Sequence, residues 1–199
     1  MSNEIFPLKY ISGCSITSKF NTRVSRSQTE VRQVNEYGGG RFGFTIELVK
    51  KKRSEHDEIF AFLNKMRGRK ETFKLIIPFY SFTKTGYKGT ILVNGAGQTG
   101  DTINVDGMSA STSILKKGDF IRFENHNKVY IVTEDLTSSA GGAGSIVISP
   151  NIVISPNDNE AVIINDVDFT VANAKDEFSL ELDLSVKAGF SLEFEEVFN

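Results

Sequence analysis

Few side chains in this sequence could carry out nucleophilic or acid–base chemistry. The chain has two histidines, His56 and His126, and one cysteine, Cys14. Nucleophilic catalysis needs a nucleophile, a base and a group that orients the base, all brought into one site. His56 falls in the first turn of a predicted helix and His126 at a predicted hairpin tip, so we expect both to be solvated. No motif surrounds Cys14, which we expect to be a partly buried structural thiol. The sequence thus predicts no catalytic residue and no enzyme.

The spacings that form metal sites are also missing. The sequence contains no H-x-x-x-H, no C-x-x-C and no loop dense in acidic residues. Those patterns are the ones that place ligands around zinc or calcium. We therefore expect neither a metal nor a cofactor.

Three glycines have the spacing of a dinucleotide-binding motif. Gly95, Gly97 and Gly100 form G-x-G-x-x-G, which binds pyrophosphate only when a helix follows and directs its N-terminus at the phosphate. Here the sequence continues as DTINVDG, which is typical of a strand and a turn. We expect a glycine-rich β-turn, whereas a helix after Gly100 would favour a small enzyme acting on phosphorylated substrates.

Charged residues cluster at both ends of a predicted helix and near the C-terminus. Basic runs at residues 50–53 and 67–70 flank the helix, and a protein of a DNA-conducting tube could present such a patch to phosphates. No aromatic residues are interleaved for base stacking, so we expect a solvated surface and no specific nucleic-acid binding. Glu193, Glu195 and Glu196 are expected on the solvent-facing side of a strand.

A strand, a helix and a second strand are predicted in the first half of the chain. Apolar residues alternate with small or polar ones across residues 42–48, which predicts a half-buried strand. Residues 54–67 carry one apolar stripe, begin at Ser54 as N-cap and are followed by Gly68, so they predict a helix. Alternation returns at residues 73–77.

The middle of the chain has a different composition. Residues 87–159 are rich in glycine and small polar side chains. Short strands are predicted at 90–94, 102–105, 119–124 and 128–133, the last two joined as a hairpin. Many short strands with no helical period are typical of a small β-barrel or sandwich.

Alternation resumes near the C-terminus and suggests a split domain. Residues 178–186 and 190–194 predict two antiparallel strands, each with one solvated face. Their apolar faces complement those of the first strand and the helix. The expected fold class is therefore mainly β, a β-barrel or sandwich with one α-helix. In it, a discontinuous core domain of residues 1–86 and 160–199 holds an inserted glycine-rich small β-barrel of residues 87–159.

Composition narrows the classes of function. The chain has 16 phenylalanines and no tryptophan, so its aromatic area is placed in a core rather than on a wet recognition surface. A net charge of −2 gives no general attraction to nucleic acid or anionic lipid. We expect no signal peptide, and the sequence has no run of about 18 apolar residues. We expect no membrane partner and a protein made and folded in a cytoplasm.

Several segments resemble tail-structural proteins of tailed bacteriophages. The first is RFGFTIELVKKKRSEHDEIFAFLNKMRGRKETFKLIIP, which resembles their strand, helix, basic RGR turn and second strand. Next come NGAGQTGDTINVDG, LKKGDFIRF and KVYIVTEDL, which are similar to an insertion that these proteins carry. The last, AGFSLEFEEVF, resembles their terminal strand. Together the segments cover most of the chain from Arg41 to Phe198 in the same order, and the nearest family is the distal tail, or baseplate hub, class.

The resemblance implies a structural subunit of a phage tail tip or baseplate, located in the virion tail after folding in the host cytoplasm. Such proteins form a homo-oligomer, a hexameric ring beneath the tail tube, and contact the tail tube protein and hub, tip or fibre proteins. Open strand edges would suit this assembly. Two alternatives stay open. One is a tail completion or neck adaptor protein; the other is a host-surface carbohydrate-binding module, against which the absence of tryptophan argues.

Overall fold

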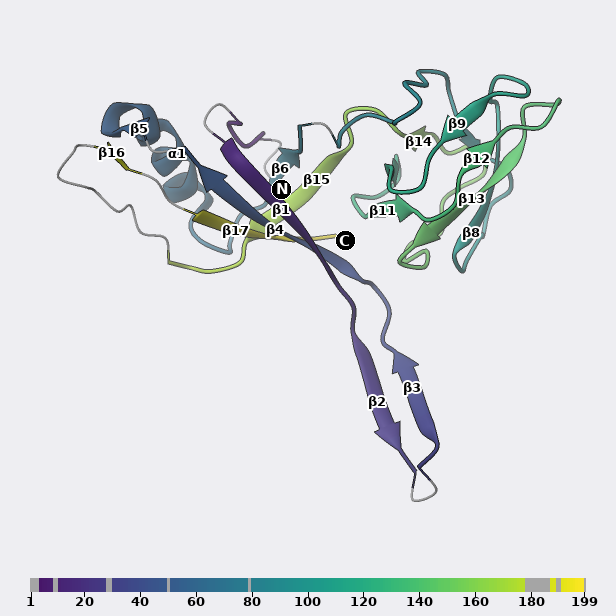
Figure 1. Ribbon diagram of the computed structural model, residues 1–199, viewed down its shortest axis with the longest axis horizontal. Coiled ribbons are helices and arrows are strands. Elements are labelled where there is room, and N and C mark those ends of the chain that lie inside the picture. The colour runs from purple at the N-terminus through teal and green to yellow at the C-terminus, as the bar shows by residue number, and fades with distance from the viewer. Residues whose placement is uncertain are drawn as a thin grey trace. The chain divides into compact units, whose positions relative to one another are not determined.

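A computed structural model describes most of the chain (Figure 1). The described residues are 4–8, 11–27, 30–49, 51–78, 80–177, 187–188 and 191–198, without the side chains of 36, 51–56 and 187–188. The chain divides into two compact units. The sheet unit comprises Met1–Ser18, Phe42–Ile77 and Asp168–Phe198, and the barrel unit comprises Lys19–Arg41 and Pro78–Val167.

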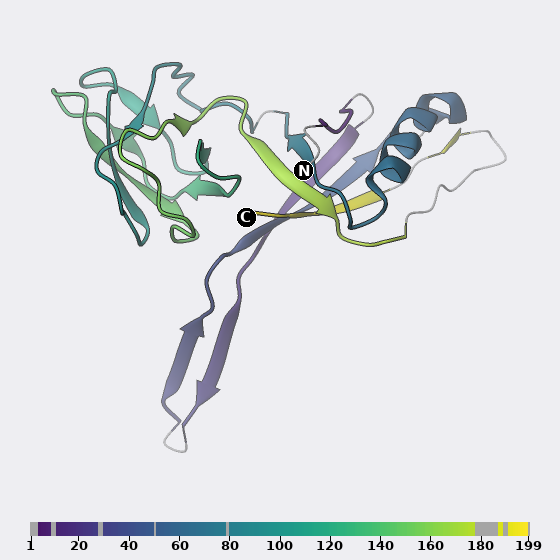
Figure 2. The same cartoon turned by 180° about the vertical axis from the view of Figure 1, so that it is seen from behind.

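The sheet unit consists of a five-stranded sheet and a helix (Figures 1 and 2). In spatial order its strands are β1 (Ile11–Lys19), β4 (Arg41–Leu48), β17 (Ser191–Glu196), β15 (Asp168–Asn173) and β6 (Phe73–Ile76). The helix α1 runs over Arg53–Met66, and two short strands pair with each other, β5 (Lys51–Lys52) and β16 (Lys187–Ala188). The sheet is discontinuous in sequence, since β17 lies between β4 and β15.

Phenylalanine rings form the centre of the sheet unit. The predicted alternation in β4 is confirmed, because Phe42, Phe44, Ile46 and Leu48 are all buried. The ring centroids of Phe73 and Phe194 lie 5.0 Å apart, and those of Phe6 and Phe194 lie 5.2 Å apart. The predicted helical stripe is also confirmed, since α1 buries Ile59, Leu63 and Met66. Phenylalanine suits this core because it brings a large apolar area with no polar atom to satisfy.

The described residues of the barrel unit form three separate sets of strands. Its six-stranded sheet has the order β14 (Val162–Ile163), β10 (Phe120–Phe123), β11 (Val129–Val132), β13 (Gly144–Ser149), β8 (Thr102–Asp106) and β7 (Leu92–Val93). A second pair joins β9 (Ser113–Leu115) to β12 (Leu136–Thr137), and a hairpin joins β2 (Thr22–Arg26) to β3 (Arg32–Glu36).

The six-stranded sheet is nearly closed into a barrel. Leu92 of β7 forms a bridge to Ala161, directly before β14, so the two outer strands of the sheet meet. The Val93 N–H donates to the Glu160 carbonyl at 2.9 Å, and the Val162 N–H donates to the Ile91 carbonyl at 2.9 Å. Aliphatic and aromatic side chains fill the interior, among them Ile103, Val105, Ile121, Phe123, Tyr130, Ile146 and Ile148.

The chain leaves and rejoins the five-stranded sheet at neighbouring positions. Strand β6 pairs with β15 in antiparallel register, and Ile76 lies opposite Asp168. Lys74, two residues earlier in β6, forms an ion pair of 2.8 Å with Asp168. The long segment between β6 and β15 is therefore held at both ends by one strand pair.

The structure confirms the predicted fold class: the described part of the chain is mainly β with one α-helix and a barrel-like sheet. The predicted strand at 178–186 lies outside the described residues. No strand was predicted at β15, whose six residues are all buried. Division into a core of 1–86 plus 160–199 and an insert of 87–159 remains a proposal. Among the described residues, none of the helical segments is long and apolar enough to cross a membrane.

Candidate functional site

The structure places Cys14 in the sheet unit and His126 in the barrel unit. Cys14 lies in β1 and is exposed, although partial burial raises the pKa of its thiol. The side chain of His56 lies outside the described residues. Within the part of the chain that the structure covers, no three His, Cys, Asp or Glu side chains gather closely enough to hold a metal ion.

His126 is buried, contrary to the prediction of a solvated side chain. It is 4% exposed, with Nδ1 at 2.6 Å from Asn125 Oδ1 and Nε2 at 3.1 Å from the Tyr130 hydroxyl. The Val153 N–H donates to that same hydroxyl at 3.2 Å. The tyrosine therefore donates to Nε2, and a neutral imidazole donates from Nδ1. Desolvation, and next the Arg122 charge, lower the pKa of His126 to about 4. This histidine closes the β10–β11 hairpin tip and faces the interior.

The glycine motif forms turns, as predicted. Gly95, Gly97 and Gly100 all have positive φ angles. The next element is strand β8, so no helix N-terminus is directed at the motif and the phosphate-binding alternative is wrong. The Gly95 N–H instead donates to Asp158 Oδ1 at 2.8 Å.

Two residues of the charged clusters, Arg69 and Glu196, take part in the packing of the sheet unit. Arg69 Nε donates to the Ala174 carbonyl at 2.8 Å, so one member of the second basic run is a structural residue. Glu193 is exposed as predicted, but Glu196 is fully buried and accepts the Phe42 N–H at 3.0 Å. The prediction that all three C-terminal glutamates face solvent is therefore wrong for Glu196. Successive side chains of a strand point to opposite faces, and Glu196 lies at a position of β17 whose side chain points to the buried face.

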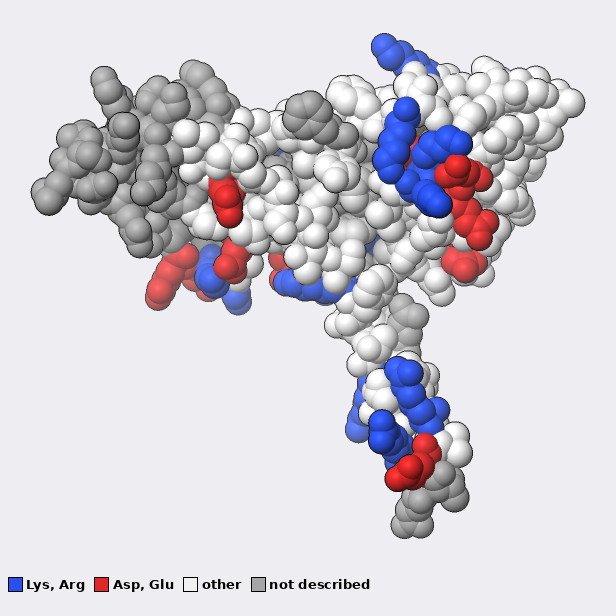
Figure 3. Space-filling model, in the orientation of Figure 1, with Lys and Arg blue, Asp and Glu red and all other residues white. Residues whose placement is uncertain are grey.

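The β2–β3 hairpin presents an extended exposed surface, which we call the hairpin surface. Every residue of β2 is exposed, and so are residues 30–35. Five large apolar or aromatic side chains in this region are each 49–59% exposed, namely Phe20, Val24, Val31, Val34 and Tyr37. Figure 3 shows Lys and Arg side chains gathered on the same hairpin. An exposed set of this kind is typical of an interaction surface.

The register assigns these side chains to faces. Val24 lies opposite Val34, and Arg26 lies opposite Arg32, the next pair on the same face. Directly paired residues of an antiparallel ribbon share a face, and each successive pair alternates. Val24, Val34, Arg26 and Arg32 therefore lie on one face, which combines an apolar pair with two adjacent positive charges.

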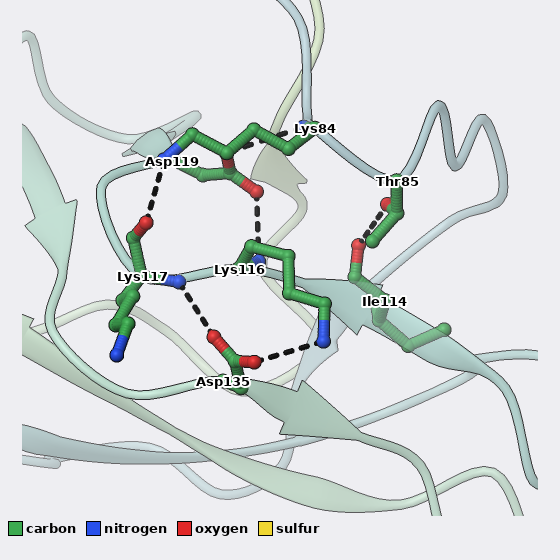
Figure 4. A network of polar contacts seen from close by, with 7 residues as sticks. All are labelled: Lys84, Thr85, Ile114, Lys116, Lys117, Asp119 and Asp135. Atoms are coloured by element: carbon green, nitrogen blue, oxygen red, sulfur yellow. Dashed lines mark hydrogen bonds and ion pairs between the residues drawn. The ribbon is translucent and has the colours of Figure 1, made fainter.

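A polar network lies in the barrel unit where the chain turns into β10 (Figure 4). Asp119 is 3% exposed and accepts the backbone N–H of Lys84 at 3.2 Å and that of Lys116 at 2.8 Å. The Lys84 ammonium donates to the Lys117 carbonyl at 2.6 Å. Asp135 accepts the Lys117 N–H at 2.9 Å and the Lys116 ammonium at 2.8 Å. The hydrogen bond from Lys116, and next that from Lys117, lower the pKa of Asp135.

This network fixes the loop that precedes β7 against the barrel. The Thr85 hydroxyl donates to the Ile114 carbonyl at 2.6 Å, and the Gly118 N–H donates to the Val132 carbonyl at 2.7 Å. Gly118 has a φ of +89°, and a Cβ there would lie 2.7 Å from Lys84 Nζ. Glycine thus lets the lysine cross the turn. The network was not predicted from the sequence, although the alternation of large and small side chains over residues 80–84 was a usable signal.

Comparison with known proteins assigns the barrel. The family profile described as distal tail protein pb9, B domain, matches residues 81–167. The matched range covers the six-stranded barrel, its β9–β12 pair and the polar network. No curated protein matches the chain. Residues 81–167 are therefore similar to the B domain of the distal tail protein pb9, and in this part the chain resembles phage distal tail proteins.

Proposed function

We propose that the protein is a structural subunit of a phage tail tip or baseplate. It assembles into a ring, hexameric in the related class, beneath the tail tube, and it anchors tip or fibre proteins. The distal tail protein match supports a structural role in the virion tail. The observation that supports assembly with other subunits is the exposed hairpin surface.

An isolated two-stranded ribbon is marginally stable in water, and monomeric proteins rarely expose a contiguous apolar surface. The hairpin nevertheless pairs over five residues on each strand, from Thr22 opposite Glu36 to Arg26 opposite Arg32. A neighbouring subunit that covers the Val24–Val34 pair would remove apolar area from water, at roughly 25 cal/mol per Å². The hairpin is therefore an assembly element.

The charges on the hairpin define what the neighbouring surface must offer. Arg26 and Arg32 are directly opposed, and like charges in that arrangement destabilise a strand pair. A carboxylate placed between the two arginines would replace their repulsion with attraction, and it could accept hydrogen bonds from both guanidinium groups. The neighbour therefore presents an apolar patch beside an acidic group.

Native mass spectrometry of the purified full-length chain tests the proposal. We expect a closed oligomer for the unmodified protein. Val24→Asp with Val34→Asp places two charges on the apolar face, and we expect this variant to be monomeric. Because these side chains are exposed, its thermal unfolding should match that of the parent.

The matched control changes the opposite face. Ser25→Asp with Gln33→Asp alters another directly paired, exposed set and adds the same charge. We expect the control to keep the oligomer. A strictly monomeric parent protein, or equal loss of assembly in both variants, would contradict the proposal.

A further inference from the structure

The barrel unit contains a hollow that assembly through the hairpin does not use. Its volume is about 280 Å³, and Tyr80, Phe82, Lys84, Gly118 and Asp119 line it. All five residues belong to the barrel unit. The hollow adjoins the polar network of Figure 4, which holds Lys84 and Asp119 in place. Its walls thus combine two aromatic rings with two groups of opposite charge.

The aromatic residues of this hollow face outward. Tyr80 is 50% and Phe82 56% exposed, whereas Ser81 and Thr83 between and after them are buried. The alternation places both rings on the outer side of one segment, followed by Lys84. The Tyr80 ring is positioned by Phe120, with centroids 6.0 Å apart. A phenylalanine kept half in water leaves apolar area hydrated, so a ligand that covers the ring removes that area from water.

The polar groups of the hollow are fixed yet retain bonding capacity. Each carboxylate oxygen of Asp119 accepts one backbone N–H and can accept a second hydrogen bond. The Lys84 ammonium donates to the Lys117 carbonyl and has two further protons to donate. Because both groups are anchored by the backbone, the hollow needs little reorganisation to bind a ligand that both donates and accepts.

We propose that this hollow binds a neutral saccharide. Pyranose rings present C–H faces that pack on aromatic rings, and their hydroxyls both donate and accept, which matches a site with one ammonium and one carboxylate. Tyr80 and Phe82 both line the hollow, so a saccharide bound there can contact both rings. The Asp119 carboxylate and the net charge of −2 disfavour a phosphate backbone. The absence of tryptophan is compensated by these two exposed rings.

Isothermal calorimetry with the full-length chain tests this inference. The neutral probes are cellohexaose, maltohexaose and chitohexaose, and the charged probes are hexagalacturonate and hexathymidylate. We expect at least one neutral hexasaccharide to bind and to bind more tightly than either charged probe. Phe82→Ala and Tyr80→Ala should each weaken that binding about tenfold or more.

Phe20→Ala is the matched control, because Phe20 is 53% exposed, similar to Phe82, but does not line the hollow. It should bind the saccharide as the parent does. Asp119→Asn should also weaken binding, and thermal unfolding measured beside it reports any loss of fold. The proposal is overturned if no neutral hexasaccharide binds, if only a charged probe binds, or if Phe20→Ala weakens binding as much as Phe82→Ala.

Discussion

Several polar side chains in this protein act from buried positions, and each has a specific partner. Glu196 accepts the Phe42 N–H across two strands, and Asp119 accepts two backbone N–H groups at a turn. His126 is held between an amide and a phenol. A buried polar group that loses its partner costs about 1–3 kcal/mol, so these residues fix the conformations of the segments that they join.

The pKa of His126 predicts a loss of stability in mild acid. Its folded-state pKa of about 4 lies below the value near 6.5 of an unfolded chain. The unfolded state then binds more protons as the pH falls, so stability is full above about pH 6.5 and is lost progressively towards pH 4. The loss should reach roughly 2–3 kcal/mol, measured by urea unfolding across this range.

Proton NMR of the histidine rings gives the direct check. His126→Gln removes one titrating resonance and so identifies it. The Arg122 and Lys128 charges lower this pKa, whereas Glu160 opposes them. A resonance of His126 that titrates near pH 6.5 would refute the burial-based explanation.

At the scale of elements, tight turns set the register of the barrel strands. Two glycines illustrate different physical requirements. Gly97 has a φ of +76° and open space where a Cβ would lie, whereas Gly142 has a φ of +73° and a Cβ position only 2.3 Å from the Met108 carbonyl oxygen. Gly97 is needed only for its left-handed backbone conformation. Gly142 is needed for that conformation and also because two backbone segments approach closely there.

Alanine at these two positions should therefore have unequal effects. We expect Gly97→Ala to destabilise the protein by about 1 kcal/mol, the cost of a left-handed conformation. Gly142→Ala adds a backbone clash and should cost about 3 kcal/mol or more. Urea unfolding of both variants compares them, and equal losses would show that the Met108 contact is unimportant.

The sequence predicted those elements whose periodicity is local. Strand β4 and helix α1 each carry a continuous apolar pattern, and the β10–β11 hairpin follows two apolar runs with a short polar loop between them. Strand β15 was missed although Phe169 and Val171 alternate with polar residues; all six of its residues are buried, and its pairing partners β17 and β6 lie far away in sequence. Burial of His126 was also missed: its partner, the Tyr130 hydroxyl, accepts the N–H of Val153, which lies far away in sequence.

At the scale of the whole molecule, the two proposals rest on different parts of the chain. The hairpin surface lies within Lys19–Arg41 and the hollow within Pro78–Val167. Assembly and saccharide binding should therefore be separable by mutation.

A single deletion tests this separation. Replacing residues 78–166 by Asn-Gly keeps the register of Ile76 opposite Asp168 and closes a two-residue hairpin. We expect the shortened chain to unfold cooperatively by circular dichroism, to form the same oligomer, and to bind no hexasaccharide. Loss of cooperative unfolding would show that the sheet unit depends on the barrel.

The pairing of Ile76 with Asp168 also bears on how such proteins diversify. A segment whose two ends are adjacent partners in one ladder can be gained, lost or exchanged by recombination without changing the register of the surrounding sheet. Lineages that share this sheet can thus differ widely in the module that it carries. The ligand that the exchanged segment binds could then change while the sheet unit stays the same.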